Sequence, residues 1–442
     1  MKRAAGAGRY LPLKHRDEVE RELPLRVQPC IIYQVPGRVR KLNRKAYIPE
    51  VVSLGPFHHG KKDLLPMEEH KVRAVRHLLR RAGKEFEEFV AGMSEVAPQL
   101  ERAYEGLHDN WSRPRLLQML VTDGCFVLEL MRIATRGRRE IQEYAPDDPL
   151  FSRHGILYMV PYIRSDMLLI ENQLPLLVLH KLVEIETGKS MLENSIKIMV
   201  LRFLSPKSKV PTSAAPGLHP LNVFRSSLLS SPPAYQYLDL RGGQHQGDHE
   251  TTNNIITIHS ATDLYNAGIR FSVSKTESLR DISFRRGVLS LPKRDIQDST
   301  ERMLQNLMAF EQLHVGAGND VTAYVFFMNT IVNSAVDVAL LRSKGIIHNA
   351  LGSDDAVVRL LGRISRKVVL DPDSTLDHVH RQLNVYCRNH VRATLYTWWA
   401  NLINTYFRNP WTFLSLTAAT LLLVFGITQT VYAILPYYRR MA

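Results

Sequence analysis

The last part of the chain contains an uncharged run that is long enough to cross a membrane. No Asp, Glu, Lys, Arg or His occurs in residues 409–438, and residues 411–435 form the apolar core of this run. A helix of roughly 20 such residues crosses a hydrocarbon layer of about 30 Å. Arg408 precedes the run, and Arg439 and Arg440 follow it. The sequence therefore predicts a single C-terminal transmembrane helix; the alternative is a buried hydrophobic helix.

The amino-terminal sequence bears on the topology of this anchor. Residues 1–29 are charged and carry no apolar stretch of the kind that a secretory signal needs, so a flexible basic leader is expected. An anchor at the extreme C-terminus then predicts a single-pass, tail-anchored protein whose body lies in the cytosol. A span of about 25 residues favours a thicker bilayer such as the plasma membrane. Asn110 lies in a glycosylation sequon and would report a body that faces the lumen.

The charge balance is basic, with 57 Lys and Arg against 43 Asp and Glu and a net charge of +14. Such a charge suits an anionic membrane, an acidic partner or nucleic acid, and the predicted anchor favours the membrane. Residues 38–45 are the most basic run, but no aromatic residue interrupts them before Tyr47 and no nucleic-acid-binding motif surrounds them. We expect a solvated surface here and no nucleic-acid partner.

Motif searches predict no cofactor, no metal and no enzymatic activity. The three cysteines, Cys30, Cys125 and Cys387, are far apart and lack the spacing of a zinc site or a disulfide framework. Nucleotide-binding, hydrolase and metalloprotease signatures do not occur. Cys125 lies in an apolar run and is expected in the core.

Apolar periodicity predicts a mainly α-helical bundle with a small β element in its second half. A globular domain is expected over residues 30–404, with a mobile insertion at residues 205–252 that is rich in Ser, Pro, Gly and His. Helices are expected at 66–90, 116–133, 165–185 (bent or divided at Pro175), 261–267, 298–313, 321–341, 354–370 and 375–404. Short strands are expected at 269–273, 282–284 and 288–291.

The segment Val51-Val52-Ser53-Leu54-Gly55-Pro56-Phe57-His58-His59-Gly60 is the most distinctive local motif. Ser53 with His58 or His59 could act as nucleophile and base, or the two histidines could bind a metal. However, Gly55-Pro56 and His59-Gly60 are turn dipeptides, and no further ligand stands at metal-binding spacing. A structural turn before the Pro66 helix is the favoured interpretation.

Several carboxylates lie in or beside apolar segments and could form catalytic pairs. Helical spacing separates Asp123 from Glu129 by about 240° and Asp166 from Glu171 by about 140°, so neither pair shares a helix face. Caps and ion pairs with Arg132 or Arg164 explain these residues more simply. The Glu171-Asn172-Gln173 triplet predicts a satisfied polar network that fixes how helices meet.

With these motifs in view, the sequence resembles the plant family of domain of unknown function 247 (DUF247), also called UPF0481. The resemblance covers nearly everything from Cys30 to Tyr438. Two departures are small: Phe57 stands where Tyr is usual, and Tyr235-Gln236 stands where the family tends to have His. The matching segments are Tyr47–Gly60, Met67–Lys71, Asp123–Leu130, Leu168–Pro175, Ala261–Leu264, Ala309–Gln312, Gly345–Gly352 and Pro410-Trp411. The family-motif residues of unknown role are Ser53, Gly55, Pro56, His58, His59, Gly60, Glu68, Lys71, Asp123, Glu129, Glu171, Asn172 and Glu311.

The resemblance implies a plant protein with a C-terminal transmembrane helix and no established biochemical activity. It also implies that some members in grasses, at two loci, act in self-incompatibility. The leading hypothesis is therefore a membrane-anchored recognition or signalling protein that contacts membrane lipid through its C-terminal helix and binds another protein. The alternative is a membrane-associated hydrolase or transferase that uses the Ser53, His58 and His59 segment.

Overall fold

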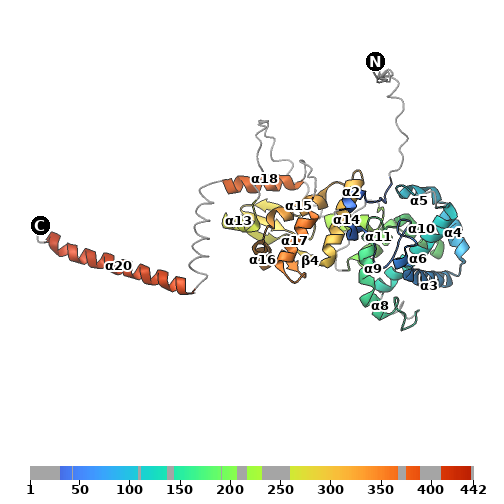
Figure 1. Ribbon diagram of the computed structural model, residues 1–442, viewed down its shortest axis with the longest axis horizontal. Coiled ribbons are helices and arrows are strands. Elements are labelled where there is room, and N and C mark those ends of the chain that lie inside the picture. Colours follow the sequence, from blue (N-terminus) through green and yellow to red (C-terminus); the bar gives the residue numbers. More distant parts are fainter. Residues whose placement is uncertain are drawn as a thin grey trace, which may run out of the picture.

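The computed structural model describes residues 30–41, 43–107, 111–136, 144–190, 192–206, 217–230, 259–366, 375–388 and 410–439. The first half of the chain is a helical bundle around α6 (Arg113–Arg136), against which α3, α4, α10 and α11 pack (Figure 1). Buried apolar side chains follow α6 from Leu116 to Ile133 on nearly all sides, so its predicted central position is confirmed. The other elements are α2 (Gly37–Arg40), η1 (Arg44–Tyr47), η2 (Lys62–Leu64), α3 (Pro66–Ala82), α4 (Phe86–Ser94), α5 (Ala97–Ala103), α8 (Arg153–Tyr158), α9 (Val160–Asp166), α10 (Leu176–Thr187), α11 (Glu193–Leu204) and α12 (Pro220–Leu229).

The second half combines helices with two small sheets, as the sequence predicts. In the first sheet, β3 lies between a parallel β1 and an antiparallel β2, with Phe271 opposite Leu289 and Phe284 opposite the same residue. The second sheet, a parallel pair of β4 and β5, was not predicted because each strand has only three residues. The elements are α13 (Ala261–Asn266), β1 (Arg270–Val273), β2 (Ser283–Arg285), β3 (Val288–Leu291), β4 (Arg294–Ile296), α14 (Asp298–Leu313), α15 (Asp320–Ile331), α16 (Ala335–Ser343), β5 (Ile347–Asn349), α17 (Asp354–Ile364) and α18 (Thr375–Arg388).

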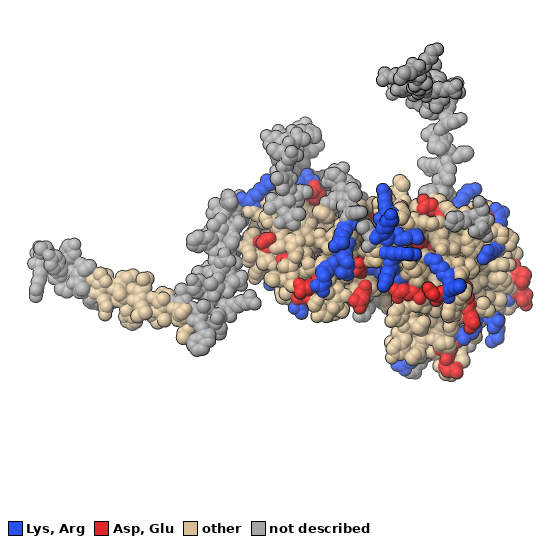
Figure 2. Space-filling view, in the orientation of Figure 1, with Lys and Arg blue, Asp and Glu red and all other residues tan. Residues whose placement is uncertain are grey.

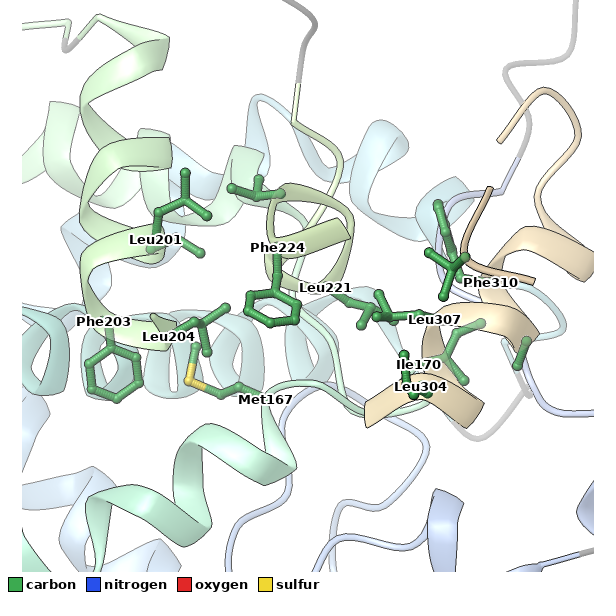
Figure 3. Close-up of a cluster of buried hydrophobic side chains, with 14 of the residues drawn as sticks. Met167, Ile170, Leu201, Phe203, Leu204, Leu221, Phe224, Leu304, Leu307 and Phe310 are labelled. Atoms are coloured by element: carbon green, nitrogen blue, oxygen red, sulfur yellow. The ribbon is translucent and has the colours of Figure 1, made fainter. Parts of the chain in front are cut away.

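A continuous apolar cluster joins the two halves (Figure 3). Side chains from α11, α12, α14 and the loop after α9 lie together, and Leu221 and Phe310 have no exposed surface. The cluster corrects the expectation of a mobile insertion at 205–252, because α12 lies inside that range and is part of the core. Residues 207–216 and 231–252 of the range lie outside the described residues.

Three predicted helices are shorter or divided. The helix expected over 66–90 ends at Gly83, which has φ 62° and caps α3; a capping box then starts α4. The helix expected over 165–185 is divided at Pro175 as predicted, with α10 covering its second part, but the part before Pro175 is wrong because α9 ends at Asp166 and an irregular loop follows. The helix expected over 321–341 bends by 108° between α15 and α16, where Ser334 starts a new capping box.

Helix α20 (Pro410–Arg439) occupies the predicted anchor region. Its described apolar side chains are largely exposed, among them Leu422 at 72% and Phe425 at 65%. Among the described residues, no single helix is both long and apolar enough to span a bilayer, and Thr417–Val431 is a shorter apolar helix. Helices α15 and α16 meet that test only as a bent pair.

Candidate functional site

The family motif at residues 50–55 runs through the interior as an irregular segment, so its backbone groups need partners from elsewhere. The carboxylate of Asp166 supplies the first of these partners. It accepts hydrogen bonds from the backbone N–H groups of Glu50, Val51 and Val52 at 2.8–3.1 Å, and Arg302 Nη2 donates to it at 2.9 Å. Burial raises the pKa of Asp166, while these donors oppose that rise. The partner expected for Asp166 was Arg164; the structure shows Arg302 instead.

Asn172 continues this pairing along the segment. Its Oδ1 accepts from the N–H of Leu54 at 2.7 Å, and its Nδ2 donates to the carbonyl of Val52 at 3.0 Å. The Asn172 side chain has no exposed surface, and all of these contacts lie within the interior. The predicted polar network of residues 171–173 is therefore confirmed, although it lies in a loop and not on a helix.

Gly55 lies where the segment turns away from this network. It has φ 75°, and a Cβ at this position would come within 2.7 Å of the carbonyl oxygen of Gln173 and 3.1 Å of the Tyr104 hydroxyl. Its N–H donates to Asp123 Oδ2 at 2.8 Å. Both the backbone conformation and the lack of space explain why glycine is needed here.

Lys71 is the centre of the buried polar network. The ammonium group has no exposed surface and donates at 2.6 Å to the Ser53 carbonyl, to Glu68 Oε1 and to Asp123 Oδ1. Ser53 Oγ also donates to Glu68 Oε1, at 3.2 Å. A buried charge is tolerated only when it is paired and hydrogen-bonded, and Lys71 meets both conditions. The network ties α3, α6 and the 50–55 segment into one unit.

His58 faces a second buried carboxylate, that of Glu171. Nε2 of His58 lies 3.2 Å from Glu171 Oε2 without good hydrogen-bond geometry, and Lys61 approaches its Nδ1 at 2.5 Å. Glu171 Oε1 accepts from the Val35 N–H at 2.7 Å and pairs with Arg40. Burial lowers the pKa of His58. Burial alone would raise the pKa of Glu171, but its contacts with His58, Val35 and Arg40 lower it overall.

The structure brings most of the motif residues together in two groups. Ser53, Gly55, Glu68, Lys71, Asp123 and Asn172 bond one another or the 50–55 segment, while His58 and Glu171 form a separate buried pair with contacts to Val35, Arg40 and Lys61. Ser53 Oγ bonds Glu68 and Lys71 and forms no hydrogen bond with either histidine, and His59 instead packs edge-on against Trp111 with ring centroids 5.4 Å apart. Pro56 is buried, and Gly60 is exposed with φ 78°. Among the described residues, no group of three or more His, Cys, Asp or Glu side chains could hold a metal ion.

Two motif residues lie elsewhere. Glu129 bonds Arg132 Nη1 at 3.0 Å, as expected, and also accepts from the Tyr144 hydroxyl at 2.9 Å. Glu311 pairs with Arg225 in the second half of the chain. Asn110 and the leader 1–29 lie outside the described residues.

Sequence reasoning missed Asn306, which ties the second half to the network. Its Oδ1 accepts from the Ile170 N–H at 3.0 Å, and its Nδ2 donates to the Ala46 carbonyl at 2.8 Å. A buried amide in the otherwise apolar stretch of α14 is the signal that could have indicated this role.

The buried ring of His219 makes the stability of the folded state depend on pH. Its Nδ1 accepts from the Asn222 N–H at 3.3 Å and lies 3.1 Å from Gln173 Oε1. Burial, with a smaller effect of His314, lowers the pKa of His219 to about 3. The folded state therefore holds the neutral ring, and its stability is fully present above the unfolded pKa of about 6.5 and decreases as the pH falls from there towards 3.

We expect the free energy of unfolding to fall by about 2 kcal/mol between pH 7 and pH 5 because of His219 alone. His219→Asn keeps a helix-capping side chain but removes the titration, so its pH-dependent loss should be smaller by that amount. Urea unfolding at the two pH values measures the difference, with the exposed His348→Asn as the control. An identical pH dependence in wild type and His219→Asn would contradict this assignment.

The basic run at residues 38–45 forms part of a positively charged surface over α2 (Figure 2). Arg38, Lys41, Arg44 and Lys45 are exposed, and none of them makes an ion pair with a described residue. This arrangement agrees with the expected solvated face.

The fold and the buried network define a mainly helical protein with two small sheets, in which the motif residues hold the interior together. The chain matches the DUF247 family model, described as a plant protein of unknown function, over residues 32–425. The chain belongs to this family. It is 31% identical to a UPF0481 protein of Arabidopsis thaliana over 93% of this chain and 87% of the relative. A second UPF0481 protein of that plant is 22% identical over 89% of this chain and 88% of the relative. No solved structure matches the chain.

Proposed function

We propose that this chain is a membrane-anchored, non-enzymatic recognition or signalling protein whose helical body binds another protein. The observation that carries the proposal is the exposed apolar surface of α20. Leu421, Leu422 and Leu423 are 60–72% exposed in consecutive positions, which is unfavourable in water and requires a bilayer or a partner as cover. The uncharged sequence of residues 409–438 and the basic residues that flank it support the bilayer.

The contacts of the motif residues support a structural role for them more than a catalytic one. Lys71 and Asp123 are buried and bonded to backbone groups and to each other, and the buried Glu171 is bonded to the Val35 N–H and paired with Arg40. Such a network rigidifies a fold and leaves its surface to bind partners.

The exposed apolar face of α8 and α9 is the part of the body that we assign to the protein partner. Leu157, Tyr158 and Tyr162 are 54–64% exposed, and His154 packs against Tyr158 with ring centroids 4.6 Å apart. Tyrosine side chains on an apolar surface are enriched at the centres of protein interfaces. A role in self-recognition of the kind that the family resemblance implies for some grass members would need this surface to differ between alleles.

Membrane extraction tests the anchor. In plant cells, we expect the full chain to remain in the membrane fraction after alkaline carbonate treatment. The double variant Leu422→Arg and Phe425→Arg should move to the soluble fraction, because charges at the centre of a span oppose insertion. Leu422→Ala with Phe425→Ala is the matched control and should stay membrane-bound. Extraction of the full chain by carbonate would contradict the anchor.

Site-specific cross-linking tests the recognition surface. A photo-reactive phenylalanine analogue at position 158 should give a discrete protein adduct in plant membranes, whereas the same group at the exposed position 277 should not. The adduct at 158 should disappear in a chain that also carries Leu157→Arg. Equal labelling at both positions, or none at 158, would contradict a partner on this face.

A further inference from the structure

A cleft of about 650 Å³ lies between the two halves of the chain. Residues of α9, the loop that follows it, the end of α11, α12 and the start of α14 line the cleft. Leu168, Phe224 and Met303 provide apolar walls, and Tyr162 lies at the rim with 54% of its surface exposed. A volume of this size is within the range of about 300–1,000 Å³ that is usual for small-molecule sites.

Arg164 lines this cleft without a partner for its charge. Its guanidinium carbon lies 5.0 Å from the ring centroid of Phe203, so the side chain is held against an aromatic face. Nε is buried and has no hydrogen-bond acceptor, and the guanidinium makes no ion pair or hydrogen bond with any described residue. Burial lowers the pKa of Arg164, and no carboxylate opposes this effect.

Arg302 also lines the cleft, and its charge is paired although its Nε, like that of Arg164, has no hydrogen-bond partner. Its side chain is 11% exposed, bonds Asp166 at 2.9 Å and lies 3.2 Å from Glu50 Oε1. Both arginines line the same cleft, yet only Arg302 has acidic partners. A partly buried cation without a partner is unfavourable unless an anion from outside completes it.

We propose that the cleft binds an organic monocarboxylate with an apolar body. The carboxylate pairs with the planar fork of Arg164, which matches its two oxygens, and the apolar body packs on Leu168, Phe224 and Met303. This small-molecule site does not depend on the membrane anchor or on the proposed protein partner.

The charges at the cleft favour a single negative charge on the ligand. Glu50 and Asp298 also line the cleft and both are exposed there, while Arg302 is already neutralised by Asp166. A dianion such as a phosphate monoester would meet one free guanidinium and two carboxylates, and like charges raise the cost of its binding. We therefore exclude phosphate esters from the ligand class.

Equilibrium dialysis of the purified full-length chain in lipid nanodiscs tests this site. The probe is 4-phenylbutyrate, compared with its neutral amide 4-phenylbutyramide and with phenyl phosphate. We expect saturable binding of 4-phenylbutyrate and binding at least about tenfold weaker for the two analogues. Arg164→Gln should weaken 4-phenylbutyrate binding by about the same factor. Arg164→Lys, which keeps the charge but loses the fork, should give an intermediate affinity.

The matched control is Arg153→Gln on α8, which removes an exposed arginine that does not line the cleft. It should bind 4-phenylbutyrate as wild type does. Arg164→Gln should unfold at the same temperature as the empty wild type or a higher one, which separates lost binding from lost folding. Absence of saturable binding by wild type, or equal binding by wild type and Arg164→Gln, would overturn the proposal. Binding of an acidic peptide through Arg164 with none of 4-phenylbutyrate would overturn it too.

Discussion

Replacing Lys71 by methionine is expected to lower the free energy of unfolding by about 3–5 kcal/mol, the usual cost of breaking a buried ion pair from one side. The substitution leaves the Asp123 carboxylate, which is 1% exposed, with the Gly55 N–H as its remaining hydrogen-bond donor. It also removes the donor to the Ser53 carbonyl. Urea unfolding followed by circular dichroism measures the loss.

Two variants make this expectation specific to the buried network. Lys62→Met removes an exposed lysine from the neighbouring turn and should change stability by less than about 0.5 kcal/mol. Asp123→Asn combined with Lys71→Met also removes the fully buried carboxylate and should recover part of the loss, because the carboxylate that still lacks its cation, Glu68, is 28% exposed and reaches water. A Lys71→Met protein as stable as the Lys62→Met protein would show that Lys71 is not a structural ion.

The helical class and several elements could be predicted because they depend on local patterns. The apolar residues of α6 recur on all sides of the helix, and Ser260 caps α13 with Asp263 as the sequence suggests. Local signals for the ends of the longer predicted helices were present, but the prediction followed the continuous apolar periodicity instead. Gly83 ends α3, and the Ser334 and Asp337 pair is a capping box inside a stretch that otherwise reads as one helix.

The buried network could be predicted only in part, because its contacts join residues far apart in the chain. The 50–55 segment shows no periodicity and takes its hydrogen bonds from Asp166 and Asn172, more than 110 residues away. The triplet at residues 171–173 indicated a polar network from composition alone. The backbone groups that the triplet bonds depend on how α3, α6 and the loop before α10 pack together. Local sequence patterns do not predict this packing.

Glu311 holds a second buried ion pair, and its replacement by alanine is expected to cost about 3–5 kcal/mol. Its Oε1 accepts from Arg225 Nε at 3.0 Å and from the Val321 N–H at 2.9 Å, and its Oε2 accepts from the Thr322 N–H at 2.9 Å. The carboxylate therefore caps the start of α15 and neutralises an arginine that is 8% exposed. Glu311→Ala leaves the helix amides without this acceptor, and Arg225 keeps only the Ala317 carbonyl at 2.6 Å and the more distant Asp320 carboxylate at 3.7 Å.

Replacing Arg225 and replacing Glu311 should lower the free energy of unfolding by different amounts. This difference distinguishes a carboxylate that caps a helix from a simple ion pair. Arg225→Met leaves Glu311 with three donors at the start of α15, from Val321 N, Thr322 N and Thr322 Oγ1. A carboxylate at a helix N-terminus remains partly stabilised, so this variant should lose less stability than Glu311→Ala does. Glu277→Ala, at an exposed position, is the control for both in urea unfolding. Equal losses for Arg225→Met and Glu311→Ala would mean that the ion pair alone stabilises this junction and that the contacts to α15 contribute little.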